Sequence, residues 1–540
     1  MAVAAASHVQ SFGRQFSGER REQERTRAVV EGRLAYLAKD HRSVTGWKPR
    51  RTLIDGTWFN ANYWYRVCLA RAAMVTVDGE EFGLLGPHSA RRSRETFARL
   101  GIKHIEILAD AAKQVKIEAA DFASRLLAAT KSANDILNWQ MPNGLPASFV
   151  YDHILKRQRI AEVNVADPAF DDYVLAACTD CLAAERLLDK INPDFVLLSH
   201  GIGMPYAALG WSAMRRGIRT VVLFGNYGVP RPFKLSEPAD FFDWNGGFTA
   251  DEIDSLGGET RAQLMAVGKS YVQRRLAGLT DDLGGNLAFS ATGRLDRDAL
   301  CRRYGWSPDV PIVAVYASNW FDYPHSFGLV RFSNFLDWTL ATLAVASKTT
   351  SINWLFKPHP CDVWYGGVTL SDLMPAQMAK HIALLPIDGS GADIMKSVDA
   401  LVCVHSTAGL EYASQGKPVL VADGGWYDRA GFAMNVSSRD DYLAALQRRW
   451  WLEIDLEVAK ERALAFAGSY FCAPEWQDNL LMTDDSVQDG AWGRIESMLD
   501  RKAELRTEID TMRLWFFSDA RRYHPFKMTH ADRFSIANAA

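Results

Sequence analysis

Two short motifs in the C-terminal half of the chain place imidazole, amine and hydroxyl groups directly after apolar runs. The first, Lys357-Pro358-His359-Pro360, follows the run INWLF, which is typical of a buried strand. The two prolines restrict the backbone and leave Lys357 and His359 displayed at the strand end. A point charge beside a titratable donor suits an anionic ligand. A rigid turn with incidental polar side chains fits this motif equally well.

The second motif, HSTAGLE at residues 405–411, lies between the run ALVCV and a predicted helix. Ser406 or Thr407 can cap that helix, and the free N–H groups of its first turn attract phosphate. Gly409 would let a ligand approach the first turn, and Glu411 lies further along, toward the hydroxyls of a ribose. The alternative is an ordinary helix cap. Because both motifs follow strands, we favour a phosphate site that also includes His405.

The order of these motifs resembles a known family. The sequence KPHP, followed by HSTAGLEYASQGKPVLVADGGWYDRAGF, is similar to the glycosyltransferases of capsule polysaccharide synthesis. These include Kdo transferases and, more distantly, bacterial sialyltransferases. The resemblance covers about residues 310–435. It implies a GT-B fold in which His359, Ser406 and Thr407 hold the phosphate of a CMP-activated sugar and Glu411 faces the ribose. It also implies that neither a metal nor another cofactor takes part.

Two further loops of the same half are expected to border the nucleotide. Ser318, Asn319 and Asp322 follow the apolar run DVPIVAVYA, and this loop covers the donor in GT-B enzymes. Such residues also form ordinary turns. Tyr427 follows the strand PVLVAD, where its ring could cover a base or a sugar. Packing between loops is the alternative for Tyr427.

The N-terminal half supplies the candidates for catalysis. His200 ends the run DFVLLS, and an imidazole has a suitable pKa for a general base in an inverting transfer. A retaining transfer would need a carboxylate near the anomeric carbon, and Asp55, after the run TLI, is the best placed. A buried histidine satisfied by the backbone is the alternative for His200. The acidic base usual in the CMP-sugar relatives has no assured counterpart in this half.

Contacts to the acceptor or to a sugar acid are expected after the strand TVVLF. The expected residues are Asn226, Tyr227 and Arg231, and Lys234 follows three residues later. Arg231 and Lys234 could equally be surface charges. Gly268-Lys269-Ser270 resembles the end of a phosphate-binding loop. The glycine that this loop requires five residues before Gly268 is replaced by Gln263, and no strand precedes the segment, so that motif is rejected.

The elements that must position these residues alternate between short apolar runs and helical segments. This alternation predicts an α/β protein with two Rossmann-like, doubly wound parallel sheets that face one another. We expect an N-terminal, acceptor-side domain at 1–285 with a helical extension at 1–45. A nucleotide-sugar domain at 286–473 follows, and a helical tail at 474–540 is expected to pack back on the first domain.

Length and composition set the outer limits. The chain of 540 residues has a net charge of −3, so nothing favours nucleic acid as a partner. Seven cysteines, an odd number, argue against a disulfide framework. No run approaches the roughly 20 apolar residues of a membrane span, and the N-terminus lacks a signal core. We expect a cytoplasmic protein, with peripheral association at the inner membrane or with polysaccharide-assembly machinery left open.

Taken together, these features predict a metal-independent glycosyltransferase that extends a bacterial surface polysaccharide or glycolipid. The preferred donor is CMP-Kdo or a related CMP-linked 2-keto sugar acid, and the acceptor is a glycan or glycolipid. A UDP- or GDP-sugar donor on the same fold is the nearest alternative. A nucleotide-sugar epimerase and a non-catalytic assembly partner are the others. The sugar, the acceptor, the stereochemical outcome and the oligomeric state stay open.

Overall fold

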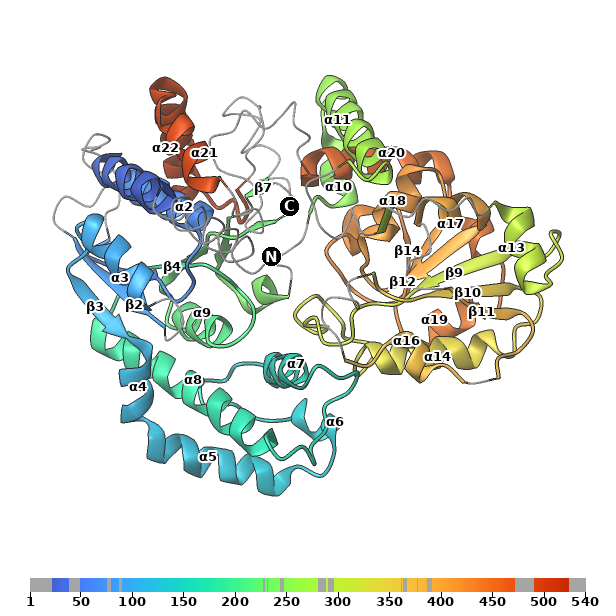
Figure 1. Cartoon of the computed structure of the whole chain (residues 1–540), viewed down its shortest axis with the longest axis horizontal. Helices are drawn as coiled ribbons and strands as arrows, with labels where there is room; N and C mark the ends of the chain where they lie inside the picture. Colours follow the sequence, from blue (N-terminus) through green and yellow to red (C-terminus); the bar gives the residue numbers. More distant parts are fainter. Residues whose placement is uncertain are drawn as a thin grey trace, which may run out of the picture.

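The computed structural model describes residues 22–37, 49–74, 79–86, 90–226, 229–230, 232–242, 247–279, 288–289, 296–360, 362, 367–375, 377–385, 391–471 and 490–523. These residues form two sheet domains that lie side by side, with helices around each sheet (Figure 1). The predicted fold class, a GT-B type α/β protein with two Rossmann-like domains, is confirmed. The boundary expected near residue 285 lies outside the described residues and stays a prediction.

The first sheet has the strand order β3-β2-β1-β4-β5-β8. Its strands are β1 (Arg51–Asp55), β2 (Glu80–Leu85), β3 (His104–Ile107), β4 (Phe195–Leu198), β5 (Arg219–Val222) and β8 (Phe233–Leu235). The first five run parallel, whereas β8 pairs antiparallel with β5, which departs from the predicted parallel sheet. Only residues 223–232 separate β5 from β8, and a parallel pairing needs a crossover of a dozen or more residues. This short connection contains the hairpin of β6 (Gly225–Asn226) and β7 (Val229–Pro230).

Helices surround the first sheet. Besides the helix at residues 22–37, they are α2 (Ala61–Met74), α3 (Ala90–Arg99), α4 (Leu108–Gln114), α5 (Lys116–Ala129), α6 (Ala133–Ile136), α7 (Ala147–Gln158), α8 (Phe170–Ile191) and α9 (Tyr206–Arg215). Every residue of α2 is buried, Arg66 and Arg71 included. The Arg71 guanidinium forms a two-pronged ion pair with Glu81, at 2.7 and 2.6 Å, which lets a charged residue lie in this interior.

The described part of the C-terminal tail covers α2. Helices α21 (Ala491–Leu499) and α22 (Lys502–Phe517) share a hydrophobic core with α2 and with the helix at 22–37 (Figure 1). Lys234 of β8 donates from Nζ to the carbonyl oxygens of Trp515 and Ser518 at the end of α22, at 2.8 and 2.5 Å. Burial lowers the pKa of Lys234 to about 8. The expectation that Lys234 meets a sugar acid or solvent is therefore wrong, because its ammonium group caps a helix.

The second sheet is entirely parallel and has the strand order β11-β10-β9-β12-β13-β14. Its strands are β9 (Ile312–Tyr316), β10 (Asn353–Lys357), β11 (Ile382–Leu384), β12 (Ala400–Cys403), β13 (Val419–Val421) and β14 (Met434–Asn435). The chain builds outward from β9 through β10 to β11 and then returns to β12 on the other side of β9. In open sheets of this kind, ligands bind at the carboxyl ends of the strands where the order reverses.

The remaining helices belong mostly to the second domain. They are α10 (Ala250–Ser255), α11 (Gly258–Leu276), α13 (Arg297–Tyr304), α14 (Phe335–Ala346), α16 (Leu370–Leu373), α17 (Gly391–Ser397), α18 (Thr407–Ser414), α19 (Arg439–Ala445) and α20 (Leu456–Phe471). The short helical turns are η1 (Pro238–Phe241), η2 (Asp428–Ala430) and η3 (Trp450–Glu453). Although α10 and α11 precede residue 286, both pack against α20 (Figure 1).

Glycines allow the close approach of α11 and α20. A Cβ atom added to Gly268 would overlap the Leu464 carbonyl oxygen, and one added to Gly468 would overlap the Leu264 carbonyl oxygen. Gly268 therefore lies in the middle of a helix as a packing residue, which agrees with the rejection of a phosphate-binding loop at Gly268-Lys269-Ser270.

Replacing Gly268 by alanine should force these helices apart. We expect a loss of about 1–3 kcal/mol in the free energy of unfolding, the usual cost of overpacking. Gly258→Ala is the matched control in the same helix, because a Cβ there meets nothing within 4 Å. Denaturant unfolding measures both variants. Equal stability of the two would contradict the tight crossing of the helices.

Helix α7 of the first domain is fixed to a loop of the second. The Asp152 carboxylate is fully buried and accepts hydrogen bonds from Nδ1 and N of His325, at 2.7 and 3.3 Å. It also accepts from N and Oγ of Ser326, at 2.8 and 2.9 Å. Asn334 donates to the Tyr151 hydroxyl at 2.9 Å. These bonds set the position of the loop after β9 relative to the first domain.

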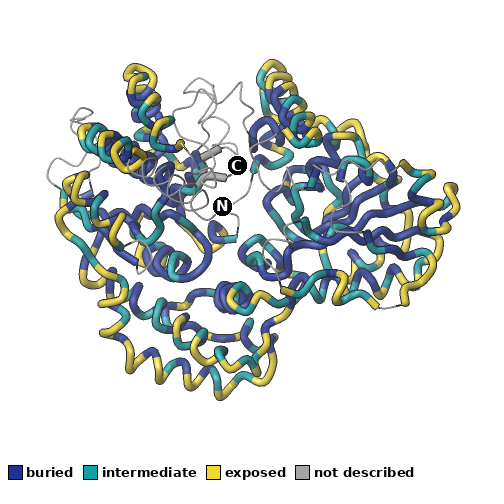
Figure 2. The backbone as a smooth tube through the Cα atoms, in the orientation of Figure 1, coloured by how far each residue is buried: buried dark blue, intermediate teal, exposed yellow. Residues whose placement is uncertain are grey.

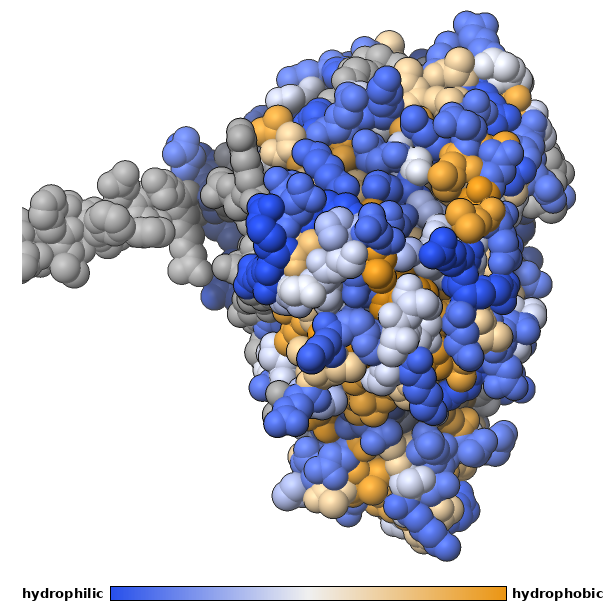
Figure 3. Space-filling model, turned by 90° about the vertical axis from the view of Figure 1, so that its right-hand side faces the viewer, coloured by the Kyte–Doolittle hydropathy of each residue, from blue (hydrophilic) through white to orange (hydrophobic). Residues whose placement is uncertain are grey.

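Exposure follows the layers of the fold. The central strands of both sheets are buried, whereas the edge strand β3 is partly exposed. Exposed residues gather on the outer helices, most visibly α5 and α11 (Figure 2). On the side of the molecule that the second domain forms, hydrophilic residues dominate and hydrophobic ones lie in small groups (Figure 3). Among the described residues, no helix is long and apolar enough to cross a membrane.

Candidate functional site

A pocket of about 130 Å³ lies at the carboxyl ends of β9, β10 and β12, where the strand order reverses. The loops after these strands all contribute to its wall, so residues far apart in the sequence meet there. Seven of the predicted nucleotide-binding residues line it, together with three aromatic residues. The lining residues are Ser318, Asn319, Asp322, Phe327, Phe335, His359, His405, Ser406, Thr407 and Trp426.

Two histidines face this pocket from the ends of β10 and β12, the strands on either side of β9. Burial lowers the pKa of His359 to about 4, against the opposing charge of Asp322. Burial also lowers the pKa of His405 to about 4, and His359 contributes to that shift. Both imidazoles are therefore neutral at pH 7 in the free protein. His405 Nδ1 is buried and has no hydrogen-bond partner among the described residues.

The N-terminus of α18 opens on the same pocket. Ser406 is the cap of this helix, and its Oγ accepts from the Ala408 N–H at 3.3 Å. Thr407, the first helical residue, receives a hydrogen bond from Arg275 at 3.3 Å. A helix start with a hydroxyl cap attracts anions, because its N–H groups point outward and its dipole is positive there.

The loop after β9 closes another side of the pocket. Asn319 is 4% exposed, and its Nδ2 donates to Asp362 at 3.2 Å. Asn319 Oδ1 is buried without a hydrogen-bond partner among the described residues. Burial raises the pKa of Asp362 to about 6. The Asp322 carboxylate lies 2.8 Å from the Lys156 ammonium of α7, which offsets its negative charge at the pocket.

The structure does not bring every predicted nucleotide-binding residue to the pocket wall. Lys357 is buried, and its ammonium group lies 5.6 Å from the centre of the Tyr316 ring. Glu411 is buried in an ion pair with Arg275 at 2.5 Å, so its expected role at a ribose is wrong. Glu411 lies one turn beyond the start of α18, and its carboxylate points toward Arg275 of α11 rather than toward the pocket.

Tyr427 and Gly409 pack behind the pocket and not on its wall. Tyr427 is 2% exposed and donates to the Ser406 carbonyl oxygen at 2.7 Å, so its ring braces the loop and does not cover a ligand. Gly409 faces this same hydroxyl, because a Cβ added there would overlap the Tyr427 oxygen. Pro360 is half-buried beside His359.

In the first domain, Asp55 and His200 are joined through Ser199. The Ser199 hydroxyl donates to Asp55 Oδ2 at 2.5 Å, and His200 Nδ1 lies 2.9 Å from Ser199 Oγ. Burial lowers the pKa of His200 to about 4, and the Arg66 guanidinium adds to this shift. The sequence placed Asp55 and His200 in different roles and did not predict that they are coupled.

The ring of His200 lies among aromatic side chains. The centre of the Trp58 ring lies 4.6 Å away at a steep angle, and that of Tyr206 lies 4.9 Å away. The loop of His200 also meets the loop after β9, since a Cβ added to Gly203 would lie 3.0 Å from the Tyr323 hydroxyl. Because Tyr323 follows Asp322 directly, the two halves of the candidate site are neighbours.

The expected acceptor contacts are mostly outside the described residues. Tyr227 and Arg231 lie there, and for Asn226 the structure gives only its place in β6. Their roles stay predictions.

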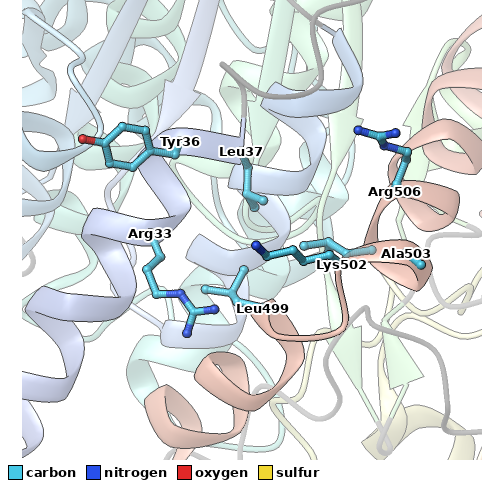
Figure 4. Close-up of a pocket in the computed structure, with 8 residues that line it drawn as sticks. Arg33, Tyr36, Leu37, Leu499, Lys502, Ala503 and Arg506 are labelled. Atoms are coloured by element: carbon cyan, nitrogen blue, oxygen red, sulfur yellow. The ribbon is translucent and has the colours of Figure 1, made fainter.

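A second and larger pocket, of about 640 Å³, lies between the helix at 22–37 and the helices α21 and α22 (Figure 4). Arg33, Lys502 and Arg506 surround an apolar floor that includes Leu37 and Leu499 (Figure 4). This pocket holds no carboxylate or imidazole for acid–base chemistry and lies away from both sheet edges. We therefore assign the chemistry to the smaller pocket.

Among the described residues, no group of three or more His, Cys, Asp or Glu side chains could hold a metal ion. The expectation that no metal takes part stays a prediction.

The sequence did not predict the aromatic part of the pocket. Phe327 and Phe335 flank His405, with ring centres 5.5 and 5.3 Å away. Trp426 donates from Nε1 to the His405 carbonyl oxygen at 2.8 Å. These three come from loop and helix-start positions where no periodic pattern distinguishes a pocket wall from a core.

Comparisons with known proteins agree with this placement of the site. Residues 333–450 match the family model described as capsule polysaccharide biosynthesis protein. The expected resemblance to capsule polysaccharide synthesis proteins is thus confirmed in the segment that contains KPHP and HSTAG. A comparison with curated proteins finds no significant match.

The solved structures that the chain is similar to share little sequence with it. A β-Kdo 2,4-transferase, KpsC of Thermosulfurimonas dismutans, is 13% identical over 50% of this chain and 78% of its own, with a TM-score of 0.32. The UDP-GlcNAc 2-epimerase of Neisseria meningitidis is 11% identical over 84% and 100%, with a TM-score of 0.24. UGT89C1 of Arabidopsis thaliana in complex with UDP is 12% identical over 85% and 100%, with a TM-score of 0.27.

Proposed function

We propose that this protein is a glycosyltransferase that uses a nucleotide-activated sugar to extend a bacterial surface polysaccharide or glycolipid. The observation that carries the proposal is the meeting of His359, His405 and the capped start of α18 in one pocket at the switch point of the second sheet. The match to capsule polysaccharide biosynthesis proteins covers this same region and supports the proposal.

The pocket suits the phosphate of a departing nucleotide. Transfer of a sugar breaks the bond between the anomeric carbon and a phosphate oxygen, and negative charge develops on that oxygen. Preorganised N–H groups and imidazoles at such a position stabilise the charge as it forms. We further propose that the α18 start and the two histidines perform this task without a metal.

The preferred donor is CMP-Kdo or a related CMP-linked 2-keto sugar acid. The pocket volume of about 130 Å³ supports a single phosphate more readily than a diphosphate with its sugar. A UDP- or GDP-sugar is the second candidate, because the same imidazoles and N–H groups could bind the phosphate groups of those donors. Peripheral association with the inner membrane, where a glycolipid acceptor would lie, remains part of the proposal.

Calorimetric titration of the full chain with CMP, UDP and GDP tests the proposal. We expect CMP to bind with the highest affinity and to take up protons on binding. Burial holds the pKa values of His359 and His405 near 4 in the free protein, and a phosphate beside them raises both values in the complex. In the pH window above 4 the complex therefore binds more protons than the free protein, and affinity falls as pH rises.

Titrations in two buffers with different ionisation enthalpies measure this proton uptake. The double variant His359→Gln, His405→Gln separates proton uptake by the two imidazoles from proton uptake by the phosphate itself. If UDP or GDP bound more tightly than CMP, the proposed donor would change to a UDP- or GDP-sugar, and the proposed glycosyltransferase activity would stand. Binding of none of the three would refute the proposal. Turnover of a nucleotide-sugar without an acceptor would favour an epimerase.

A further inference from the structure

The Asp55 carboxylate has both of its oxygens occupied. Asp55 Oδ1 accepts from the Thr57 N–H and hydroxyl, at 2.8 and 2.6 Å. Asp55 Oδ2 accepts from the Ser199 N–H and hydroxyl, at 3.1 and 2.5 Å. The side chain is 1% exposed. A carboxylate held in this way has no free lone pair directed at a sugar, so it is not a nucleophile.

These bonds determine which nitrogen of His200 carries the proton. The Ser199 hydroxyl has one proton, which it donates to Asp55, so its oxygen can only accept from its other neighbours, the Tyr206 hydroxyl and the His200 ring. His200 Nδ1 lies 2.9 Å from this oxygen. Nδ1 therefore carries the proton, and Nε2 of the neutral ring has a free lone pair. Among the described residues, His200 Nε2 has no hydrogen-bond partner.

The groups that face the His200 ring suit a sugar hydroxyl at Nε2. Trp58, Tyr206 and Phe224 surround the ring, and each of the three is half-buried. Flat aromatic surfaces of this kind pack against the apolar faces of sugar rings. The charged groups nearby are Asp55, which acts through Ser199, and Arg66 of α2, which opposes protonation of the ring.

We infer that His200 Nε2 is the general base for the acceptor hydroxyl, that Ser199 and Asp55 are its positioning residues, and that transfer inverts the anomeric configuration. This inference rests on the proposed function. The acceptor oxygen forms a bond to the anomeric carbon while the bond from that carbon to the phosphate oxygen breaks. The electron pair of the broken bond leaves with the nucleotide phosphate. The hydroxyl proton passes to Nε2 and is later released to water.

The tautomer can be measured without any substrate. In the 15N spectrum of the histidine-labelled full chain, the His200 signals, assigned by their loss in His200→Gln, should show a protonated Nδ1 and an unprotonated Nε2. Ser199→Ala should shift the ring toward the other tautomer, whereas Ser199→Thr, which keeps the hydroxyl, should preserve the original one. A protonated Nε2 in the unmodified protein would overturn the inference.

Turnover of CMP-Kdo with a panel of methyl glycosides as acceptors then tests the chemistry. His200→Gln should lower kcat about 10²–10⁴-fold, the usual contribution of a general base. CMP affinity should stay within a factor of about two, since His200 does not line the phosphate pocket. Ser199→Ala should also lower kcat, and Ser199→Thr should restore it. Proton NMR of the first product should show the inverted anomer.

The outcomes separate this inference from the proposed function. Retained configuration, or an unchanged kcat in His200→Gln, would overturn the inference and leave the transferase intact. If the unmodified protein did not bind CMP, or bound it but transferred no sugar to any acceptor, the proposed function would instead be refuted. Equal kcat for Ser199→Ala and Ser199→Thr would remove Ser199 as a positioning residue.

Discussion

Replacing His359 by alanine should remove the increase in melting temperature that CMP produces and should lower kcat about 10²–10³-fold. His359 lines the phosphate pocket beside the start of α18, and its loss removes one donor to the departing phosphate. Deletion of a single preorganised donor at a developing charge costs this much in other enzymes. Thermal denaturation with and without CMP measures the first effect, and initial rates measure the second.

The matched control is His104→Ala. His104 is exposed on β3, the far edge strand of the first sheet, where it stacks on Phe82. Its removal should leave both the CMP-induced shift and kcat unchanged. If His359→Ala kept the full shift while the apo melting temperature stayed normal, His359 would not belong to the nucleotide site.

The second large effect is expected from Asp152→Ala at the contact between the domains. Asp152 is fully buried and accepts four hydrogen bonds from His325 and Ser326. Its removal leaves these donors buried without an acceptor, and each unsatisfied buried donor costs about 1–3 kcal/mol. The first transition in scanning calorimetry should fall by about 10 °C.

An exposed carboxylate provides the comparison for Asp152. Asp121 pairs with Arg125 at 3.2 Å on α5, and both side chains are more than 60% exposed. Surface pairs of this kind contribute about 0–1 kcal/mol, so Asp121→Ala should hardly move the transition. A shift of similar size in the two variants would show that the α7 contact does not hold the domains together.

The fold was predictable because its signals are local. Short apolar runs followed by turn residues mark the strands of a parallel sheet, and the cap at Ser406 marks the start of α18 as predicted. The carboxyl ends of parallel strands share one edge, so residues 318–322, 359 and 405–407 could be expected to meet. The direction of β8 was not predictable from its apolar pattern, which is the same in parallel and antiparallel strands.

Side-chain partners were the part that sequence could not supply. From the sequence, Glu411 is expected to be a free carboxylate near a ribose. In the structure it pairs with Arg275, which is distant in the chain. Asp55 and His200 appeared as rival catalytic groups, and only tertiary structure reveals that Ser199 joins them. The buried Lys234 likewise gave no local sign that α22 would receive its ammonium group.

The proposed function depends on the pocket at the ends of β9, β10 and β12 binding the phosphate of the nucleotide. A crystal structure of the full chain with CMP tests it. We predict a phosphate within hydrogen-bond distance of the His359 ring and of the N–H groups that begin α18. CMP bound elsewhere, for example between the helix at 22–37 and α22, with this pocket empty, would show that the pocket is not the phosphate site.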